Sequence, residues 1–127
     1  MKESYSGTLK SGQEIYIPNW PVAVALENLS LVGKLLSSES VIRISELNVA
    51  AAVVAVMECA DPKRASAMIR HFVCQVRIDN KKIESGTIDD MFMGDLHLVI
   101  ELFAHVIHSQ YADFFSLGLA KEPSPEQ

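Results

Sequence analysis

Four side chains capable of metal-binding or acid–base chemistry recur late in the sequence. They are His97, Glu101, His105 and His108, at spacings of four, four and three residues. At about 100° per residue, these spacings place all four on one stripe of a single α-helix. Imidazole and carboxylate groups are suitable ligands for zinc and other divalent metals. The stripe is therefore the first candidate for a functional site.

A metal site built from this stripe alone is nevertheless disfavoured. Four ligands in a row along one helix cannot converge tetrahedrally on a single ion, and their spacing differs from the pattern of zinc proteases. We expect the stripe to be the polar face of an otherwise apolar helix, in which His97 and His105 each pair with Glu101. We predict no metal and no other cofactor, and the four residues remain weak metal-ligand candidates.

No residue arrangement typical of an enzyme active site is found. The serines fall mainly in turns and at expected helix starts, where serine is common as a capping residue. The six glycines are scattered and form no phosphate-binding loop. Asp89 and Asp90 are adjacent at an expected helix start, where the helix dipole favours carboxylates without any catalytic role. The sequence therefore predicts a protein that is not an enzyme.

The chain of 127 residues is long enough for one domain and too short for two ordinary ones. Hydrophobic residues make up 49% of it, and the mean hydropathy of +0.17 is high for a small soluble protein. The longest apolar run, Val49–Met57, is far shorter than the roughly 20 residues of a bilayer-crossing helix. We therefore expect no membrane span, and the excess apolar surface must lie in the core or at an interface.

The net charge of −5 is unevenly distributed along the chain. Residues 1–87 carry ten Lys and Arg against nine Asp and Glu, whereas residues 88–127 carry one against seven. Opposite charges on one chain can attract neighbouring copies, although an ordinary solvated surface is an equal alternative. Because the chain is acidic overall, it lacks the basic footprint of nucleic-acid-binding proteins, and nucleic-acid binding is disfavoured.

Hydrophobic periodicity and turn signals predict a mainly α fold. We expect a compact domain of four to five helices with a short N-terminal β-hairpin over about 7–18, which turns at Ser11-Gly12. The domain is expected to span 1–120, followed by a mobile tail over 121–127. The helices are expected over about 21–37, 46–60, 62–76 and 96–116, with a short one after Thr87 and with Val49–Met57 as the core helix. Asp61 and Asp95 are expected to cap the helices over 62–76 and 96–116, and Gly118 is expected to end the last one. An extended segment is expected at Val41–Ile44, and a polar turn or second small hairpin at 78–83.

The expected first helix is apolar over more than half of its circumference. A surface helix needs an apolar stripe only about 100° wide, so this helix is either central or faces a partner on a second side. Aromatic and aliphatic residues also gather at the end of the expected last helix. Candidate protein-contact residues are Leu31, Leu35, Phe114, Phe115, Leu117 and Leu119. The alternative for each of them is a place in the intramolecular core.

The order of these features resembles a known family. A short hairpin ending in Glu-Ile-Tyr-Ile-Pro-Asn-Trp, a helical body and a charged tail containing proline follow one another, and Gly7–Trp20 and Phe103–Phe115 are the most recognisable pieces. This layout is similar to that of the small tail assembly chaperones of long-tailed bacteriophages.

The resemblance implies a non-enzymatic protein that acts in the host cell cytoplasm. It would bind the tape measure protein, keep it soluble, help recruit tail tube subunits and be absent from the finished virion. Self-association into a homo-oligomer would protect its apolar surface when no client is bound. The closest alternative is a structural baseplate or tail component of the virion, and a small metal- or nucleic-acid-binding module is less favoured.

Overall fold

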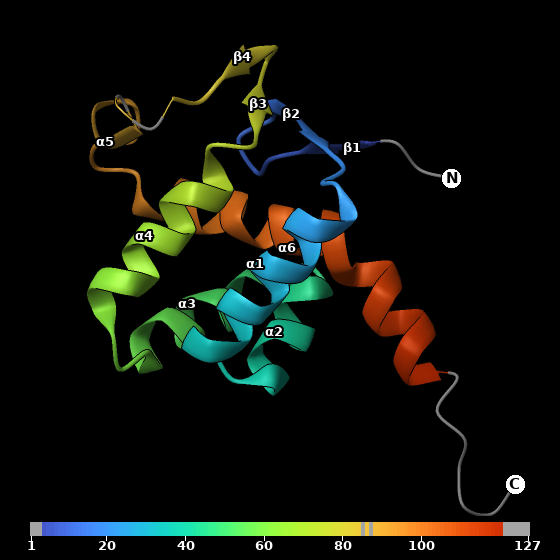
Figure 1. The fold of residues 1–127 in the computed structure, drawn as a ribbon. Coiled ribbons are helices and arrows are strands. Elements are labelled where there is room, and N and C mark those ends of the chain that lie inside the picture. The colour runs from blue at the N-terminus through green and yellow to red at the C-terminus, as the bar shows by residue number, and fades with distance from the viewer. Residues whose placement is uncertain (1–3, 85, 87, 121–127) are drawn as a thin grey trace, which may run out of the picture.

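Six helices and four short strands make up the part of the chain that the structure describes (Figure 1). The computed structural model describes residues 4–84, 86 and 88–120, so the predicted tail over 121–127 lies outside the described residues. None of the described helices is long and apolar enough to cross a membrane. The elements in chain order are β1 Ser4–Thr8, β2 Glu14–Pro18, α1 Val22–Leu35, α2 Ser38–Ser45, α3 Val49–Glu58, α4 Pro62–Val73, β3 Arg77–Ile78, β4 Lys81–Lys82, α5 Ile88–Met91 and α6 Leu96–Ala120.

The first half of the long helix α6 is the centre of the molecule. In Figure 1 the sheet lies above α6 and the helices α2 and α3 lie below it. The helix packs against α2, α3, α4 and β1, and every residue from 100 to 107 is buried. A helix that is buried on all of its faces forms the core itself rather than covering one. The last turns of α6 extend beyond the other elements (Figure 1).

The sequence predicts Val49–Met57 as the core helix, and this prediction is wrong. Helix α3 packs against α2 and α6, but its buried residues are only Ala52 and Ala55. Val54 and Met57 on its other faces are exposed. Because apolar residues occupy every face of α3, periodicity gives no signal for which face turns inward. The inward face carries Ala52 and Ala55, whose small side chains allow two helices to approach closely.

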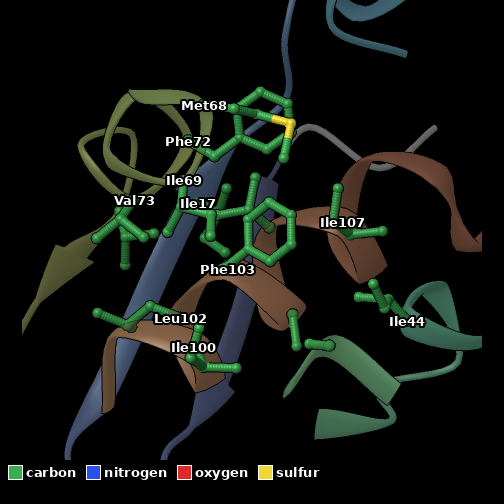
Figure 2. Close-up of a cluster of buried hydrophobic side chains, with 14 of the residues drawn as sticks. Ile17, Ile44, Met68, Ile69, Phe72, Val73, Ile100, Leu102, Phe103 and Ile107 are labelled. Atoms are coloured by element: carbon green, nitrogen blue, oxygen red, sulfur yellow. The ribbon is translucent and has the colours of Figure 1, made fainter. Parts of the chain in front are cut away.

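The core is built around a pair of aromatic rings. Phe72 of α4 and Phe103 of α6 lie with their ring centroids 5.7 Å apart, and both are fully buried. Ile17 of β2, Ile44 of α2 and Met68 of α4 surround them (Figure 2). Residues from three other elements thus meet on α6, which explains why this helix carries apolar side chains on every face except its polar stripe.

The four strands form one antiparallel sheet in the order β1-β2-β3-β4. The N-terminal hairpin is confirmed: Ser6 pairs with Tyr16, and Gly12 in the turn has a φ of +94°, which glycine adopts without steric cost. The second small hairpin is also present, and it joins the first where Ile15 of β2 pairs with Ile78 of β3. A lone hairpin is only marginally stable. Contacts between β1 and α6 support the N-terminal hairpin here.

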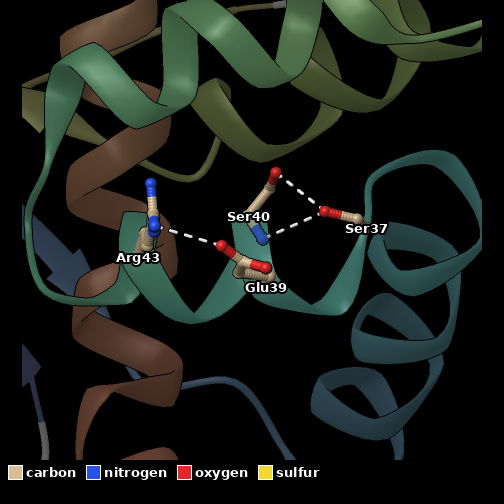
Figure 3. A network of polar contacts seen from close by, with 4 residues as sticks. All are labelled: Ser37, Glu39, Ser40 and Arg43. Atoms are coloured by element: carbon tan, nitrogen blue, oxygen red, sulfur yellow. Dashed lines mark hydrogen bonds and ion pairs between the residues drawn. The ribbon is translucent and has the colours of Figure 1, made fainter.

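The segment Val41–Ile44, expected to be extended, lies in helix α2 instead. Ser37 caps this helix, since its Oγ accepts a hydrogen bond from the backbone N–H of Ser40 at 3.1 Å. Glu39 and Arg43 form an ion pair at 3.1 Å one turn apart (Figure 3). The helix packs on α6, and that burial outweighs the weak extended preference of a four-residue run. With α2 included, the described residues form six helices rather than the four to five expected.

Local signals at other helix starts are confirmed. The carboxylate of Asp61 accepts a hydrogen bond from the backbone N–H of Arg64 at 3.2 Å, and Asp95 accepts one from Leu98 at 3.3 Å. The predicted end of the last helix is wrong, because α6 continues through Gly118. One glycine costs a helix about 1 kcal/mol relative to alanine, which is too little to end a long one.

Candidate functional site

The stripe of His97, Glu101, His105 and His108 is polar, as expected, but its two central residues are not solvated. Glu101 is 8% exposed and His105 is 4% exposed, whereas His97 is exposed and His108 is half-buried. Burying a polar side chain is costly unless it is hydrogen-bonded. The partners of these two side chains therefore decide what the stripe does.

The partners come from the N-terminal hairpin, about a hundred residues away in the chain. The Tyr5 hydroxyl lies 3.0 Å from Nδ1 of His105, and Oε2 of Glu101 accepts the backbone N–H of Lys10 at 2.9 Å. Nδ1–H of His108 donates to the Ser45 carbonyl at 2.9 Å. We call Tyr5, Lys10, Glu101, His105 and His108 the polar seam. It fastens β1, its turn and α2 to α6.

Burial shifts the pKa values of two side chains of the polar seam, His105 and Tyr5. It lowers the pKa of His105, an effect that the nearby Glu101 carboxylate opposes and His108 reinforces. Burial also raises the pKa of the Tyr5 hydroxyl. Both side chains are therefore neutral at pH 7, and the contact between them is a hydrogen bond rather than an ion pair. This chemistry suits a structural fastening and supplies no activated nucleophile.

The described residues contain no group of three or more His, Cys, Asp or Glu side chains arranged to hold a metal ion. The structure brings Glu101 and His105 together with the hairpin rather than with further ligands. His97 and Glu101 share a shallow cleft beneath the hairpin turn, but the carboxylate there is already hydrogen-bonded to Lys10. Three of the four weak metal candidates, Glu101, His105 and His108, thus hold other elements to α6 through hydrogen bonds.

The predicted protein-contact residues are divided between surface and core. Phe114 and Leu117 of α6 are exposed. Leu31, Leu35 and Phe115 are partly buried and pack against the core. The side chain of Leu119 lies outside those that the structure describes.

Sequence reasoning missed other exposed apolar side chains. On α1 the exposed apolar residues include Val22 and Leu26, which lie earlier in the helix than the predicted Leu31 and Leu35. Around α3, α5 and the start of α6 they include Val54, Met57, Met91, Met93 and Leu96. No periodic pattern marks the second group, because Met91, Met93 and Leu96 flank a short helix and a turn.

Four of the exposed residues, Val22, Leu26, Leu96 and Phe114, line two apolar grooves. The α1–α6 groove, about 340 Å³, lies between the start of α1 and the last turns of α6. The α4–α5 groove, about 510 Å³, lies between α4, α5, the end of α3 and the start of α6. Residues lining the first include Trp20, Val22, Leu26, Tyr111 and Phe114, and those lining the second include Val56, Pro62, Ile69, Phe92, Leu96 and Val99.

The fold thus defines the class of this protein. It is a small, mostly helical domain with an N-terminal strand pair and two apolar grooves. A sequence profile of the family described as "Phage tail assembly chaperone protein, TAC" matches residues 11–121, which is most of the chain. The chain belongs to this phage tail assembly chaperone family. No curated protein and no solved structure matches it.

Proposed function

We propose that this protein is a non-enzymatic chaperone that binds the tape measure protein of its phage and assists assembly of the tail tube around it. The observation that carries the proposal is the exposed apolar surface at the two grooves, in a chain of the tail assembly chaperone family. Patches of this kind on a small protein mark sites of protein–protein contact.

Such a chaperone must expose apolar surface to its client while the free protein itself stays in solution. Each Å² of apolar surface that a client covers contributes about 25 cal/mol, so a groove lined by several aliphatic side chains provides useful affinity. The net charge of −5 opposes aggregation of the free protein. Self-association through the same apolar surface is a further part of the proposal, because it would shield the grooves between clients.

The proposed site of action is the host cell cytoplasm, where tail subunits assemble. Recruitment of the tail tube protein is the second proposed interaction. The protein would leave before the tail is complete, which separates this role from that of a structural baseplate or tail component.

Co-expression with the tape measure protein of the same phage tests the proposal. We expect the tape measure protein to be insoluble alone and to copurify with this chain in a soluble complex. A tape measure protein that stays insoluble and is not retained by tagged chaperone would contradict the proposal. Mass spectrometry of purified phage particles provides a second test, since a chaperone is expected to be absent and a structural component present.

A further inference from the structure

We infer that an extended segment of the tape measure protein adds to the sheet as a further strand, beside the open edge of β1. The inference rests on the proposed function for the identity of this partner. Strand β1 is the last strand of the sheet on the side away from β4, and no other described strand pairs with its outer edge (Figure 1). An open edge presents a row of unpaired N–H and C=O groups, and another extended chain matches such a row.

The register of the sheet shows which backbone groups lie on this edge. Along an antiparallel strand, successive residues direct their N–H and C=O groups alternately to one side and to the other. Leu9, directly after β1, donates its N–H to the Gln13 carbonyl at 2.8 Å, on the side of β2. The residues two and four positions before Leu9 face β2 in the same way. The intervening Ser4, Ser6 and Thr8 therefore turn their N–H and C=O groups to the open edge.

The two edges of the sheet differ in their protection against a further strand. Strand β4 has only two residues, Lys81 and Lys82, and both a short length and lysine side chains discourage strand addition. Strand β1 has five residues, Ser-Tyr-Ser-Gly-Thr, and contains neither a charged residue nor proline. The edge of β1 is therefore the one that can accept a partner strand.

Open space lies on both sides of this edge. Thr8 lines the shallow cleft beneath the hairpin turn, about 680 Å³, and also a cleft of about 520 Å³ on the outer face of the sheet. Side chains of an added strand would alternate between these two sides. Lys10 and Glu46 line the first cleft, and Arg77 and Asp79 line the second. Because both clefts carry charges of both signs, they fit a segment with polar side chains on its two faces.

The polar seam holds this edge in place before a partner binds. Tyr5 lies inside β1 and Lys10 lies two residues after it, and both are hydrogen-bonded to side chains of α6. A preformed edge loses little conformational freedom when a strand is added, so more of the interaction energy appears as affinity. The buried polar groups of α6 thus serve binding as well as stability.

A proline substitution tests the edge. Ser6→Pro removes the outward N–H of Ser6 and leaves the hydrogen bonds between β1 and β2 in place, and edge strands accept proline at such positions. Ser6→Ala removes the hydroxyl but keeps the N–H, and it is the matched control. Lys82→Pro places a proline on the β4 edge instead. Circular dichroism and thermal unfolding verify that the three variants fold.

Affinity for the tape measure protein is then measured for each variant. We expect Ser6→Pro to weaken binding by about fivefold or more, and the two controls to change it by less than about twofold. No loss in Ser6→Pro, or an equal loss in either control, overturns the strand addition while the chaperone function stands. Failure of the unmodified chain to bind the tape measure protein overturns the proposed function itself, and this inference with it.

Amide hydrogen exchange provides a test without any substitution. In the free protein, the N–H groups of Ser6 and Thr8 should exchange faster than those of Tyr5 and Gly7, which face β2. In the complex with the tape measure protein, we expect exchange at Ser6 and Thr8 to become slow as well. Unchanged exchange at these two residues overturns the inference. If exchange there slows in the free protein as its concentration rises, the added strand belongs to a second copy, which also overturns it.

Discussion

Helix α3 and the first half of α6 are both rich in apolar residues but lie in different environments. In α3 apolar residues occupy every face, whereas in α6 they occupy every face except one polar stripe. In α6 the residues from 100 to 107 are all buried, whereas α3 buries two alanines and exposes Val54 and Met57. The difference shows that high apolar content does not by itself place a helix in the core.

The largest expected effect comes from truncating the centre of α6. Phe103→Ala removes a fully buried ring that packs against Phe72, and we expect the free energy of unfolding to fall by about 3–5 kcal/mol. Urea denaturation followed by circular dichroism measures this loss. A decrease below about 1 kcal/mol would mean that α6 is not the core helix, and the comparison with α3 would fail.

A smaller effect is expected where α6 carries polar side chains inside the same buried half. Glu101→Ala leaves the backbone N–H of Lys10 without its acceptor, which we expect to cost about 1–3 kcal/mol of unfolding free energy. Glu101→Gln retains an acceptor oxygen at that place and serves as the control. Recovery of most of the loss by glutamine would show that the hydrogen bond, rather than the charge, fastens the hairpin.

Protonation of His105 is expected to destabilise the fold moderately. Burial lowers its pKa in the folded protein, so the unfolded chain binds more protons once the pH falls below the ordinary histidine value of about 6.5. Stability is therefore complete above that pH and is lost as the pH falls towards the folded-state pKa, at no more than about 1.4 kcal/mol per pH unit.

Thermal unfolding between pH 7.5 and 5 measures this dependence. His105→Gln cannot take up the proton and should flatten the profile in this range, whereas His97→Gln, at an exposed position of the same helix, should leave it unchanged. An unaltered slope in His105→Gln would assign the acid sensitivity to another group.

The smallest effect is expected on α3. Val54→Ser replaces an exposed apolar side chain by a polar one of similar helix propensity, so we expect the unfolding free energy to change by less than about 0.5 kcal/mol. Denaturation under the conditions used for Phe103→Ala gives a direct comparison. A loss of several kcal/mol would show that α3 is as deeply packed as α6.

Elements with strong local signals could be predicted from the sequence, and elements decided by distant contacts could not. The turn at Ser11-Gly12 and the helix starts at Asp61 and Asp95 depend on neighbouring residues, and all three are present. The helical state of Val41–Ile44 depends on packing against α6, which no local pattern reveals. Hydrophobic periodicity also fails to predict which face of α3 is buried, because every face of this helix is apolar.

The candidate site was likewise predictable only where residues close in sequence determine it. The spacing from His97 to His108 correctly placed four polar residues on one helix, but the burial of Glu101 and His105 depends on Tyr5 and Lys10 at the far end of the chain. Among the predicted contact residues, Phe114 and Leu117 are exposed, where aromatic and aliphatic residues cluster in sequence, and only Phe114 lines a groove.

The polar seam also bears on the order in which the chain can fold during synthesis. Tyr5 and His105 are separated by 100 residues, and Lys10 and Glu101 by 91. At a translation rate of about 5–20 residues per second, the N-terminal hairpin leaves the ribosome roughly 5–20 seconds before the helix that supports it. Until then β1 and β2 have no partner in α6, and the protein completes its fold only when nearly all of it has been made.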